Sequence, residues 1–362
     1  MSKPYEKETY FGLTMDPVHI GTGGYRLGRV DNTITREPGT NLPKVPGTGI
    51  SGVTRAFTAM AIQSENPMIP KKMKYQRPSR EITKKDGTKE IVYDSCAGKG
   101  GEKGESHCGE PDCEVCVAYG FSKDGNSFQG MAQFFDARIL FFPVYSMLGP
   151  VWVTSESIMG EFKVREGIMS AIEVKDATLT DKDKEMFRRF NTSLQIPENK
   201  LNQIPKNKLN LGWLMLECED GEVNLTDNSS YIPQEIKERL ILVSDKLFSR
   251  IVNDNLEVRT SVAIDPATGA AVDGALYTYE AIPRATVLWF DVVYNKPENF
   301  RIKQDGVDQP IKHGKLDGKG WEWIKENVEK GLKLIEYMGV GGMNTRGMGR
   351  MRILNLKGLE NE

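Results

Sequence analysis

The segment ATVLWFDVVY, residues 285–294, decides the fold class that we predict for this chain. Its β-branched and aromatic residues follow one another with a single charge among them, a composition that favours a β-strand. Other strand-like segments occur before and after it. We expect them at residues 8–15, at 133–153 as two strands with a turn, and at 258–264, 275–282 and 351–356.

Helical periodicity separates some of these strands. We expect helices at residues 47–63, 180–190, 233–252 and 321–338, and a hairpin after residue 211 with Asp220-Gly221 at its tip. Several strand segments follow one another without a helix between them. This order favours an α+β fold of the ferredoxin-like kind over a doubly wound parallel sheet, in which helices alternate with strands.

Composition excludes several classes of protein. The chain has 362 residues, a formal net charge of -2 and a pI near 6.1. A protein that binds nucleic acid through bulk positive charge would be far more basic, so any nucleic-acid site must be a local groove. Residues 71–89 are rich in lysine and arginine, and we interpret them as a solvated loop, with phosphate contact as the second interpretation.

We expect a cytoplasmic protein without a membrane span. The longest apolar stretch, residues 139–153, is interrupted by Pro143 and Pro150 and is shorter than the roughly 20 residues that a membrane helix needs. The first residues, MSKPYEKETY, lack the apolar region of a secretory signal.

Four cysteines with close spacing predict a metal site. Cys96, Cys108, Cys113 and Cys116 follow the pattern C-x11-C-x4-C-x2-C, and His107 precedes the second of them. Cytoplasmic thiols stay reduced, and Zn²⁺ prefers four soft ligands in a tetrahedron. We expect a structural zinc held by the four cysteines, or by three of them with His107. The alternative is a loop with free thiols.

Two glycine-rich loops are candidates for contact with phosphate. The first is HIGTGGYRLGRVDN, residues 19–32, and the second is GVGGMNTRGMG, residues 339–349. Backbone N–H groups of glycines can approach a phosphate closely, but a carboxylate among phosphates repels them unless it binds a metal or handles a proton. Asp31 therefore either performs chemistry or caps a turn.

Common catalytic motifs are absent from the sequence. We find no G-x-x-x-x-G-K-[ST] phosphate loop, no G-x-S-x-G elbow and no H-E-x-x-H pair. The chain has three histidines, so conventional histidine acid–base catalysis has few candidates.

Five motifs carry a resemblance to a known family. They are PVHIGTGGYRLGRVDNTITRE (17–37), LPKVPGTGISGVTR (42–55), FFDARILFFPVYSMLGPVWVTS (134–155), GALYTYEAIPR (274–284) and GVGGMNTRGMGRMRI (339–353). In this order they resemble the RAMP superfamily of CRISPR RNA-binding proteins, and within it the backbone subunits of type III-B, or Cmr, effector complexes.

The resemblance implies an architecture and partners. It implies a single RAMP domain over residues 1–362 with a modified RRM-like, ferredoxin-like palm. It also implies a thumb hairpin, which we expect at residues 165–225. The basic arm and cysteine-rich zinc insertion that the composition predicts at residues 64–120 is an addition to the plainest family pattern. Copies of such a subunit stack as a filament along a CRISPR guide RNA, together with other Cmr-type subunits, and complementary target RNA is cut at regular intervals.

The resemblance also implies site residues. Asp31 occupies the position of the family's cleavage residue, and a divalent cation such as Mg²⁺ is expected to assist it. Tyr279 and Glu280 are expected beside it. Many relatives have a lysine where this chain has Ser51, so guide contact there would depend on Arg55 or the backbone. The residues expected to bind RNA are His19, Gly21, Gly23, Arg26, Arg29, Arg55, Arg284, Thr345 and Arg346.

This chemistry needs few catalytic groups, because RNA supplies its own 2′-hydroxyl nucleophile and the protein has only to orient the bond and assist charge or proton movement. The sequence leaves two alternative functions open. The chain can be a scaffold that binds guide RNA without cutting, or the equivalent backbone subunit of a type III-A complex. Hydrolysis by the cysteine-bound metal ranks last, because four ligands leave no open coordination position.

Overall fold

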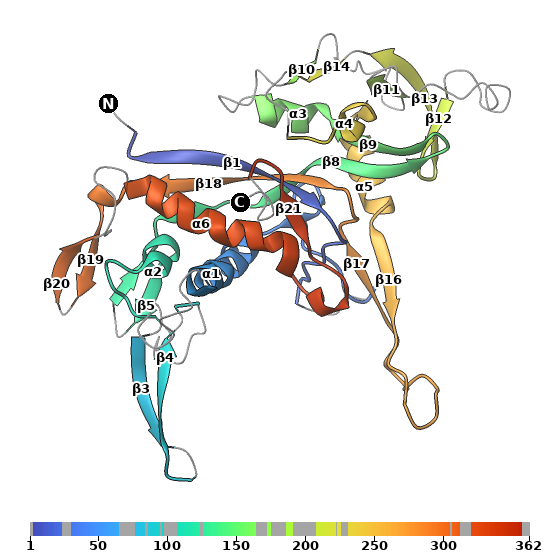
Figure 1. Cartoon of the computed structure of the whole chain (residues 1–362). Helices are drawn as coiled ribbons and strands as arrows, with labels where there is room; N and C mark the ends of the chain where they lie inside the picture. The colour runs from blue at the N-terminus through green and yellow to red at the C-terminus, as the bar shows by residue number, and fades with distance from the viewer. Residues whose placement is uncertain are drawn as a thin grey trace.

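A computed structural model shows a mixed α+β chain built around a large twisted sheet, which confirms the predicted class (Figure 1). The structure describes residues 3–23, 30–64, 77–83, 86–94, 96–97, 107–123, 126–163, 172–174, 186–190, 208–221, 223–225, 231–304, 306–311 and 320–356.

The strand predicted at residues 285–294 is β18 (Val287–Asn295), and it lies inside the large sheet. Every residue from Val287 to Val292 is buried, including Asp291, as a strand covered on both faces requires. β18 pairs antiparallel with β1 (Tyr5–Thr14) on one side, and with β8 (Ala137–Ser146) and the short β7 (Ala132–Phe134) on the other.

Eleven strands of the described residues form this sheet. Nine of them lie in the order β12 (Lys208–Leu211), β13 (Leu214–Gly221), β11 (Met186–Phe190), β15 (Leu240–Val243), β9 (Gly149–Ser155), β8, β18, β1 and β21 (Met351–Ile353), while β2 (Lys44–Val45) pairs with β8. The remaining described elements are shorter pairs and helices that cover or extend the sheet.

One half of the sheet has a simple connectivity. Along the chain, β1 is followed by helix α1 (Gly47–Ser64), β8, β18, helix α6 (Gly320–Met338) and β21. In the sheet the four strands lie in the order β8-β18-β1-β21. The two helices pack against each other and against the sheet (Figure 1). Gly331 permits this approach, because a Cβ there would collide with the carbonyl oxygen of Thr54.

Each face of the sheet has its own apolar core. Ile50 of α1 and Leu332 of α6 are fully buried in the larger cluster, together with Phe290 of β18. On the opposite face Phe11 and Trp289 belong to a second cluster, which helices α3 (Glu156–Lys163) and α4 (Gln234–Lys237) help to cover. Both faces of the sheet are thus covered by apolar packing, so a binding site has to be formed by the loops at its ends.

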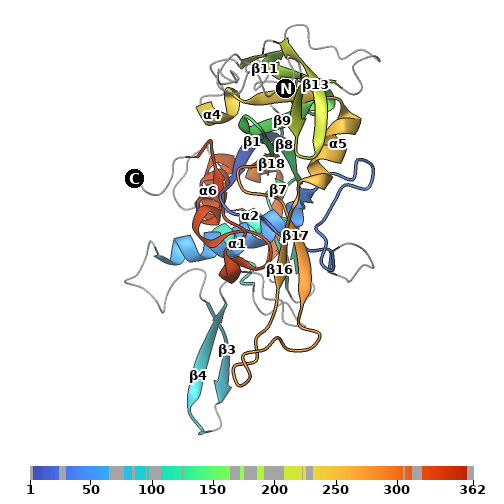
Figure 2. The ribbon, with the colours of Figure 1, turned by 90° about the vertical axis from the view of Figure 1, so that its right-hand side faces the viewer.

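Two hairpins project from the same side of the body in both views (Figures 1 and 2). One is β3 (Arg77–Thr83) with β4 (Lys89–Asp94), within the predicted basic arm. The other is β16 (Glu257–Ser261) with β17 (Tyr277–Ala281), whose strands were expected from the sequence. The other described pairs are β5 (Phe121–Lys123) with β6 (Asn126–Phe128), β10 (Ile172–Val174) with β14 (Val223–Leu225), and β19 (Arg301–Gln304) with β20 (Val307–Pro310).

The helix predicted at residues 233–252 is wrong in its middle. The segment divides into α4, the strand β15 and helix α5 (Asp245–Asp254). All four residues of β15 are buried, and β15 pairs parallel with β9, so the run LILV gains sheet hydrogen bonds on a strand buried on both faces. Ser244 then starts α5 as its N-cap, with the side chain accepting a hydrogen bond from the N–H of Leu247.

Two further predictions need correction. The helix expected at residues 180–190 is wrong where it is described, because Met186–Phe190 forms β11 between β13 and β15, which supply backbone partners on both sides. Residues 180–185 lie outside the described residues. The hairpin with Asp220-Gly221 at its tip is also wrong: β13 pairs with β12 through the turn at Gly212, whereas β14 pairs with β10.

Among the described residues, no helix combines the length and the apolar character needed to cross a membrane.

Candidate functional site

The two glycine-rich loops lie beside each other at the base of the β16–β17 hairpin. Val18 and Ile282 exchange two backbone hydrogen bonds, of 2.8 and 2.9 Å, which tie the first loop to the end of β17. The N–H of Gly342 in the second loop donates to the carbonyl oxygen of His19 at 2.9 Å. Gly341 must remain a glycine there, since its φ is +83° and a Cβ would collide with the same carbonyl oxygen. The loops therefore form one surface.

Asp31 is held by Thr278 of β17. Its Oδ2 accepts hydrogen bonds from the backbone N–H of Thr278 at 2.7 Å and from the Thr278 hydroxyl at 2.9 Å. These bonds lower the pKa of the Asp31 carboxyl below its ordinary value, because they stabilise the ionised form. Within the described part of the chain, Oδ1 accepts no hydrogen bond. Asp31 is thus not a local turn cap, since its partner lies 247 positions away.

His19 is fixed by the next positions of the same strand. Its Nδ1 lies 2.6 Å from the carbonyl oxygen of Glu280, and because a carbonyl only accepts, Nδ1 must carry the proton. Tyr279 packs edge-on against the ring, with the centroids 5.9 Å apart. Nε2 faces Gly21, where a Cβ would lie only 3.1 Å away. The second ring nitrogen, Nε2, is thereby directed toward the glycine loop.

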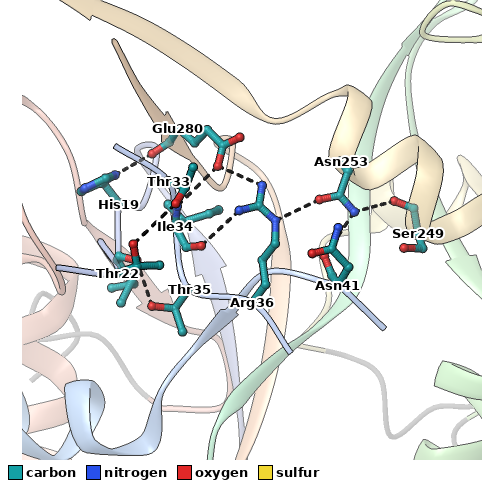
Figure 3. A network of polar contacts seen from close by, with 11 residues as sticks. His19, Thr22, Thr33, Ile34, Thr35, Arg36, Asn41, Ser249, Asn253 and Glu280 are labelled. Atoms are coloured by element: carbon teal, nitrogen blue, oxygen red, sulfur yellow. Dashed lines mark hydrogen bonds and ion pairs between the residues drawn. The ribbon is translucent and has the colours of Figure 1, made fainter. Parts of the chain in front are cut away.

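A polar network anchors this loop to the body of the protein (Figure 3). Arg36 forms an ion pair with Glu280 at 2.9 Å and donates through Nε to Asn253 of α5 at 3.1 Å. Asn253 in turn donates to the carbonyl oxygens of Ser249 and Asn41. Glu280 therefore holds the loop in place through its ion pair with Arg36. Tyr279 holds the loop through its ring contact with His19.

An open depression of about 460 Å³ lies next to Asp31. Its lining residues come from both glycine loops and from β17: His19, Gly21, Thr22, Gly23, Asn32, Thr33, Tyr277 and Met343. The exposed Arg346, in the short helix η6 (Asn344–Arg346), donates to the Tyr277 hydroxyl, and Thr345 beside it is exposed. Glycine backbone and His19 thus line the hollow, while Asp31 adjoins its lining residue Asn32 and Arg346 contacts its lining residue Tyr277.

Other predicted site residues lie elsewhere. Arg284 is exposed in the turn between β17 and β18. Arg26 and Arg29 lie outside the described residues. Arg55 of α1 points to the cysteines, where its Nε donates to the carbonyl oxygen of Cys96 and its Nη2 to Nδ1 of His107, both at 2.8 Å. Two of its donors therefore have partners inside the protein, and the RNA contact of Arg55 stays a prediction.

The four cysteines meet at the N-terminus of helix α2 (Glu114–Tyr119). All four are buried, and their sulfur atoms lie within 4.8 Å of one another. The N–H of Cys116 donates to the sulfur of Cys113, and the N–H of Cys108 to that of Cys96. Hydrogen bonds from the neighbouring thiols lower the pKa of Cys116, which favours its thiolate form.

This geometry fits a tetrahedral metal ion. Zinc–sulfur bonds of about 2.3 Å in a tetrahedron place the sulfurs about 3.8 Å apart, and Cys108 and Cys116 have their sulfurs 3.7 Å apart. His107 accepts from Arg55 through Nδ1, and burial lowers the pKa of its ring to about 4, so it stays neutral. In the part of the chain that the structure describes, the four cysteines, without His107, form the group that could hold a metal ion.

Comparison with known proteins identifies the family to which this chain belongs. A model of the RAMP superfamily matches residues 13–352. This chain belongs to the RAMP superfamily. The CRISPR system Cmr endoribonuclease Cmr4 of Pyrococcus furiosus is 23% identical to this RAMP chain over 356 residues, which cover 94% of the chain and 92% of the relative.

Solved structures share the fold of this RAMP chain. A chain of the type III-B Cmr-beta complex bound to cognate target RNA has a TM-score of 0.56 and 13% identity, and the match covers 97% of this chain and 99% of that one. Oligomeric Cmr4 from Pyrococcus furiosus has a TM-score of 0.51 and 17% identity, with 97% and 98% covered.

Two residues of this RAMP site were missed by sequence reasoning. Thr278 holds Asp31, and Arg36 neutralises Glu280. Thr278 lies in GALYTYEAIPR, where the alternation of residues predicts a strand but does not indicate which loop the strand will contact. Arg36 lies five positions after Asp31, and only the position of β17 in space reveals its partner.

Proposed function

We propose that this RAMP protein is the guide-RNA-binding backbone subunit of a type III-B CRISPR effector complex and that it cleaves complementary target RNA at regular intervals. The similarity to Cmr proteins extends over nearly the whole chain. The observation that carries the proposed activity is the ionised carboxylate of Asp31, which is held by Thr278 at the edge of a glycine-lined hollow. Its partners are guide RNA, target RNA, further copies of itself and other Cmr-type subunits.

Asp31 is the proposed catalytic residue. The 2′-hydroxyl of the target strand would lose its proton and attack the adjacent phosphate, while the bond from phosphorus to the 5′-oxygen of the next nucleotide breaks and that oxygen takes up a proton. The products are a 2′,3′-cyclic phosphate and a 5′-hydroxyl, and the protein has to hold the reacting atoms in line. A divalent cation such as Mg²⁺ would supply positive charge for the phosphate, and Mg²⁺ commonly uses one or two carboxylates together with phosphate oxygens. With Oδ2 bound to Thr278, Oδ1 of Asp31 is the atom that fits such a role.

The surrounding groups are proposed to bind the RNA backbone. Gly21 and Gly23 can offer backbone N–H groups, and Nε2 of His19 can accept from a ribose hydroxyl. Positive charge for the phosphates is proposed to come from Arg346 with Thr345 beside it, from Arg284, and from Arg26 and Arg29 in the first loop. Such contacts would bind phosphates locally, as a chain with no net positive charge requires.

We infer that the sheet β8-β18-β1-β21 with α1 and α6 is the ferredoxin-like palm, since its connectivity is βαββαβ with this strand order. We assign the thumb to the β16–β17 hairpin in place of residues 165–225. The described strands of 165–225 include β11, β12 and β13 at the end of the large sheet, whereas β16–β17 projects from the body beside Asp31 (Figure 2).

Shortening this thumb is expected to disturb the cutting pattern. Val262, Ile264 and Leu276 are exposed apolar residues of the hairpin, at 42%, 55% and 66%. Replacing residues 262–276 with an Asn-Gly turn removes them but leaves Thr278 in place. We expect the chain to melt at an unchanged temperature, while target cleavage loses its regular spacing. Sharp, regularly spaced cuts from the shortened protein would contradict the assignment.

The cysteine cluster is proposed to hold a structural zinc ion. A closed set of four thiolates would stabilise the insertion and leave no position for substrate. The guanidinium of Arg55 lies against the carbonyl oxygen of Cys96 and places a positive charge beside the thiolates. Arg55 therefore connects the zinc insertion to helix α1 of the palm.

Replacing Arg55 with methionine is expected to loosen this connection. The variant loses two hydrogen bonds, so we expect zinc to be lost faster to a chelator and the melting temperature to fall by on the order of 3 °C. The matched control is Arg301→Met, since Arg301 is exposed on β19. Unchanged zinc release together with a loss of bound RNA would contradict the role assigned to Arg55.

The first test of the function is the RNA that accompanies the protein. We expect the assembled complex, purified under native conditions, to contain small RNA of defined length that protects this subunit's loops from proteolysis. A scaffold without catalytic activity would also bind this RNA but would leave a complementary target intact. A complex free of RNA would contradict the proposal.

A further inference from the structure

We propose that Thr278 is the positioning residue of the cleavage site and that its hydroxyl group sets the orientation of the Asp31 carboxylate. The inference deepens the proposed function and rests on it, because it needs Asp31 to act on RNA. Thr278 itself contacts no reacting atom in this proposal. Its role is exerted through Asp31.

Three hydrogen bonds join the two residues in a closed arrangement. The backbone N–H of Asp31 donates to Oγ1 of Thr278 at 3.1 Å. The Thr278 hydroxyl donates its proton to Oδ2 of Asp31 at 2.9 Å, and the backbone N–H of Thr278 donates to the same oxygen at 2.7 Å. A hydroxyl has one proton and two acceptor sites, so it can make both of its bonds at once.

This arrangement restricts the carboxylate in a way that a single bond does not. Two donors on Oδ2 stop rotation of the carboxylate group, and the bond from the Asp31 N–H fixes the backbone from which the side chain projects. The neighbouring Asn32 is held on the same strand, since its N–H donates to the carbonyl oxygen of Thr278 and its own carbonyl accepts from Glu280. Oδ1 is thereby directed away from Thr278.

The same strand also fixes His19. The carbonyl oxygen of Glu280, two residues after Thr278, accepts the proton of His19 Nδ1. Residues two apart on a strand lie about 7 Å apart and face the same side of the sheet. β17 thus sets the relative position of Asp31 and His19, and the Thr278 hydroxyl is the one side-chain group of this strand that bonds the carboxylate.

Two substitutions separate the hydroxyl from the shape of the side chain. Thr278→Val keeps the β-branched shape that suits a strand and removes the hydroxyl, whereas Thr278→Ser keeps the hydroxyl and removes the methyl group. In the assembled complex we expect Thr278→Val to cut target RNA roughly tenfold to a hundredfold more slowly, the size of a lost hydrogen bond to a charged group. We expect Thr278→Ser to stay within about threefold of the wild type.

The controls distinguish failure of this inference from failure of the proposed function. Thr40→Val, at an exposed threonine outside the thumb and both glycine-rich loops, should cut normally. If Asp31→Asn cuts like the wild type, the proposed function is wrong. If Asp31→Asn is inactive and Thr278→Val cuts normally, the proposed function stands and the inference is overturned. If Thr278→Val and Thr278→Ser lose the same share of the cleavage rate, or if Thr278→Val fails to assemble, Thr278 acts through packing. Either result also overturns the inference.

Discussion

Asp31→Asn is expected to stop target-RNA cleavage while the complex still assembles and retains its guide RNA. Asparagine has the shape of aspartate, and its side-chain oxygen can still accept from the N–H of Thr278, so the loop should keep its conformation. The negative charge is lost, and with it the ability to hold a cation or receive a proton. We expect the cleavage rate to fall by at least about a hundredfold, the usual size of a lost acid–base or electrostatic contribution.

The dependence of this activity on pH follows from the contact with Thr278. Hydrogen bonds lower the pKa of Asp31, so its carboxylate remains ionised from about pH 8 down to about pH 5. Cleavage by the wild type should therefore show no loss over this range that arises from Asp31.

The matched control for Asp31→Asn is Asp308→Asn, which changes an exposed carboxylate on β20 and should leave cleavage unchanged. Full activity of Asp31→Asn would exclude Asp31 as the catalytic residue.

Loss of the cysteine ligands is expected to have the largest effect on stability. In Cys113→Ser the N-cap sulfur of α2 is replaced by a harder oxygen, and the tetrahedral set is broken. Because metal binding and folding are coupled in such sites, we expect zinc to fall from about one ion per chain to below about 0.2 and the insertion to become sensitive to protease. Elemental analysis and limited proteolysis measure these two changes.

The fifth cysteine provides the control for this experiment. Cys218 belongs to β13, which is not among the elements that carry the cluster, so Cys218→Ser should retain zinc. A chelator added to the wild type should reproduce the protease sensitivity of Cys113→Ser. Substoichiometric zinc in the wild type, with an ordered insertion, would contradict the metal site.

Local sequence patterns were sufficient for the central strand and the two long helices. The apolar run of β18 and the helical spacing in α1 and α6 depend on neighbouring residues, so they were predicted correctly. β15 was not, because its apolar residues also fit a helical spacing and its parallel partner β9 lies far away in the chain. The prediction for β11 was wrong for the same reason, because its pairing with β13 and β15 cannot be deduced from its own residues.

The site shows the same limit. Asp31 and His19 could be proposed from the glycine-rich loop, but the residues that hold them, Thr278 and Glu280, come from the other end of the chain. Arg55 was expected to contact RNA through the family resemblance, because Ser51 stands where many relatives have a lysine. Its partners inside the protein, Cys96 and His107, belong to an insertion whose position in space the sequence does not reveal.

Cleavage by complexes assembled from mixtures of wild-type and Asp31→Asn subunits would show directly whether Asp31 cuts the target RNA. If each copy of this chain holds one cleavage site, every cut in a complementary target should weaken in proportion to the share of variant subunits, while the positions of the cuts stay the same. Cuts of full strength in complexes made only of Asp31→Asn subunits would show that another residue or another subunit cleaves the RNA.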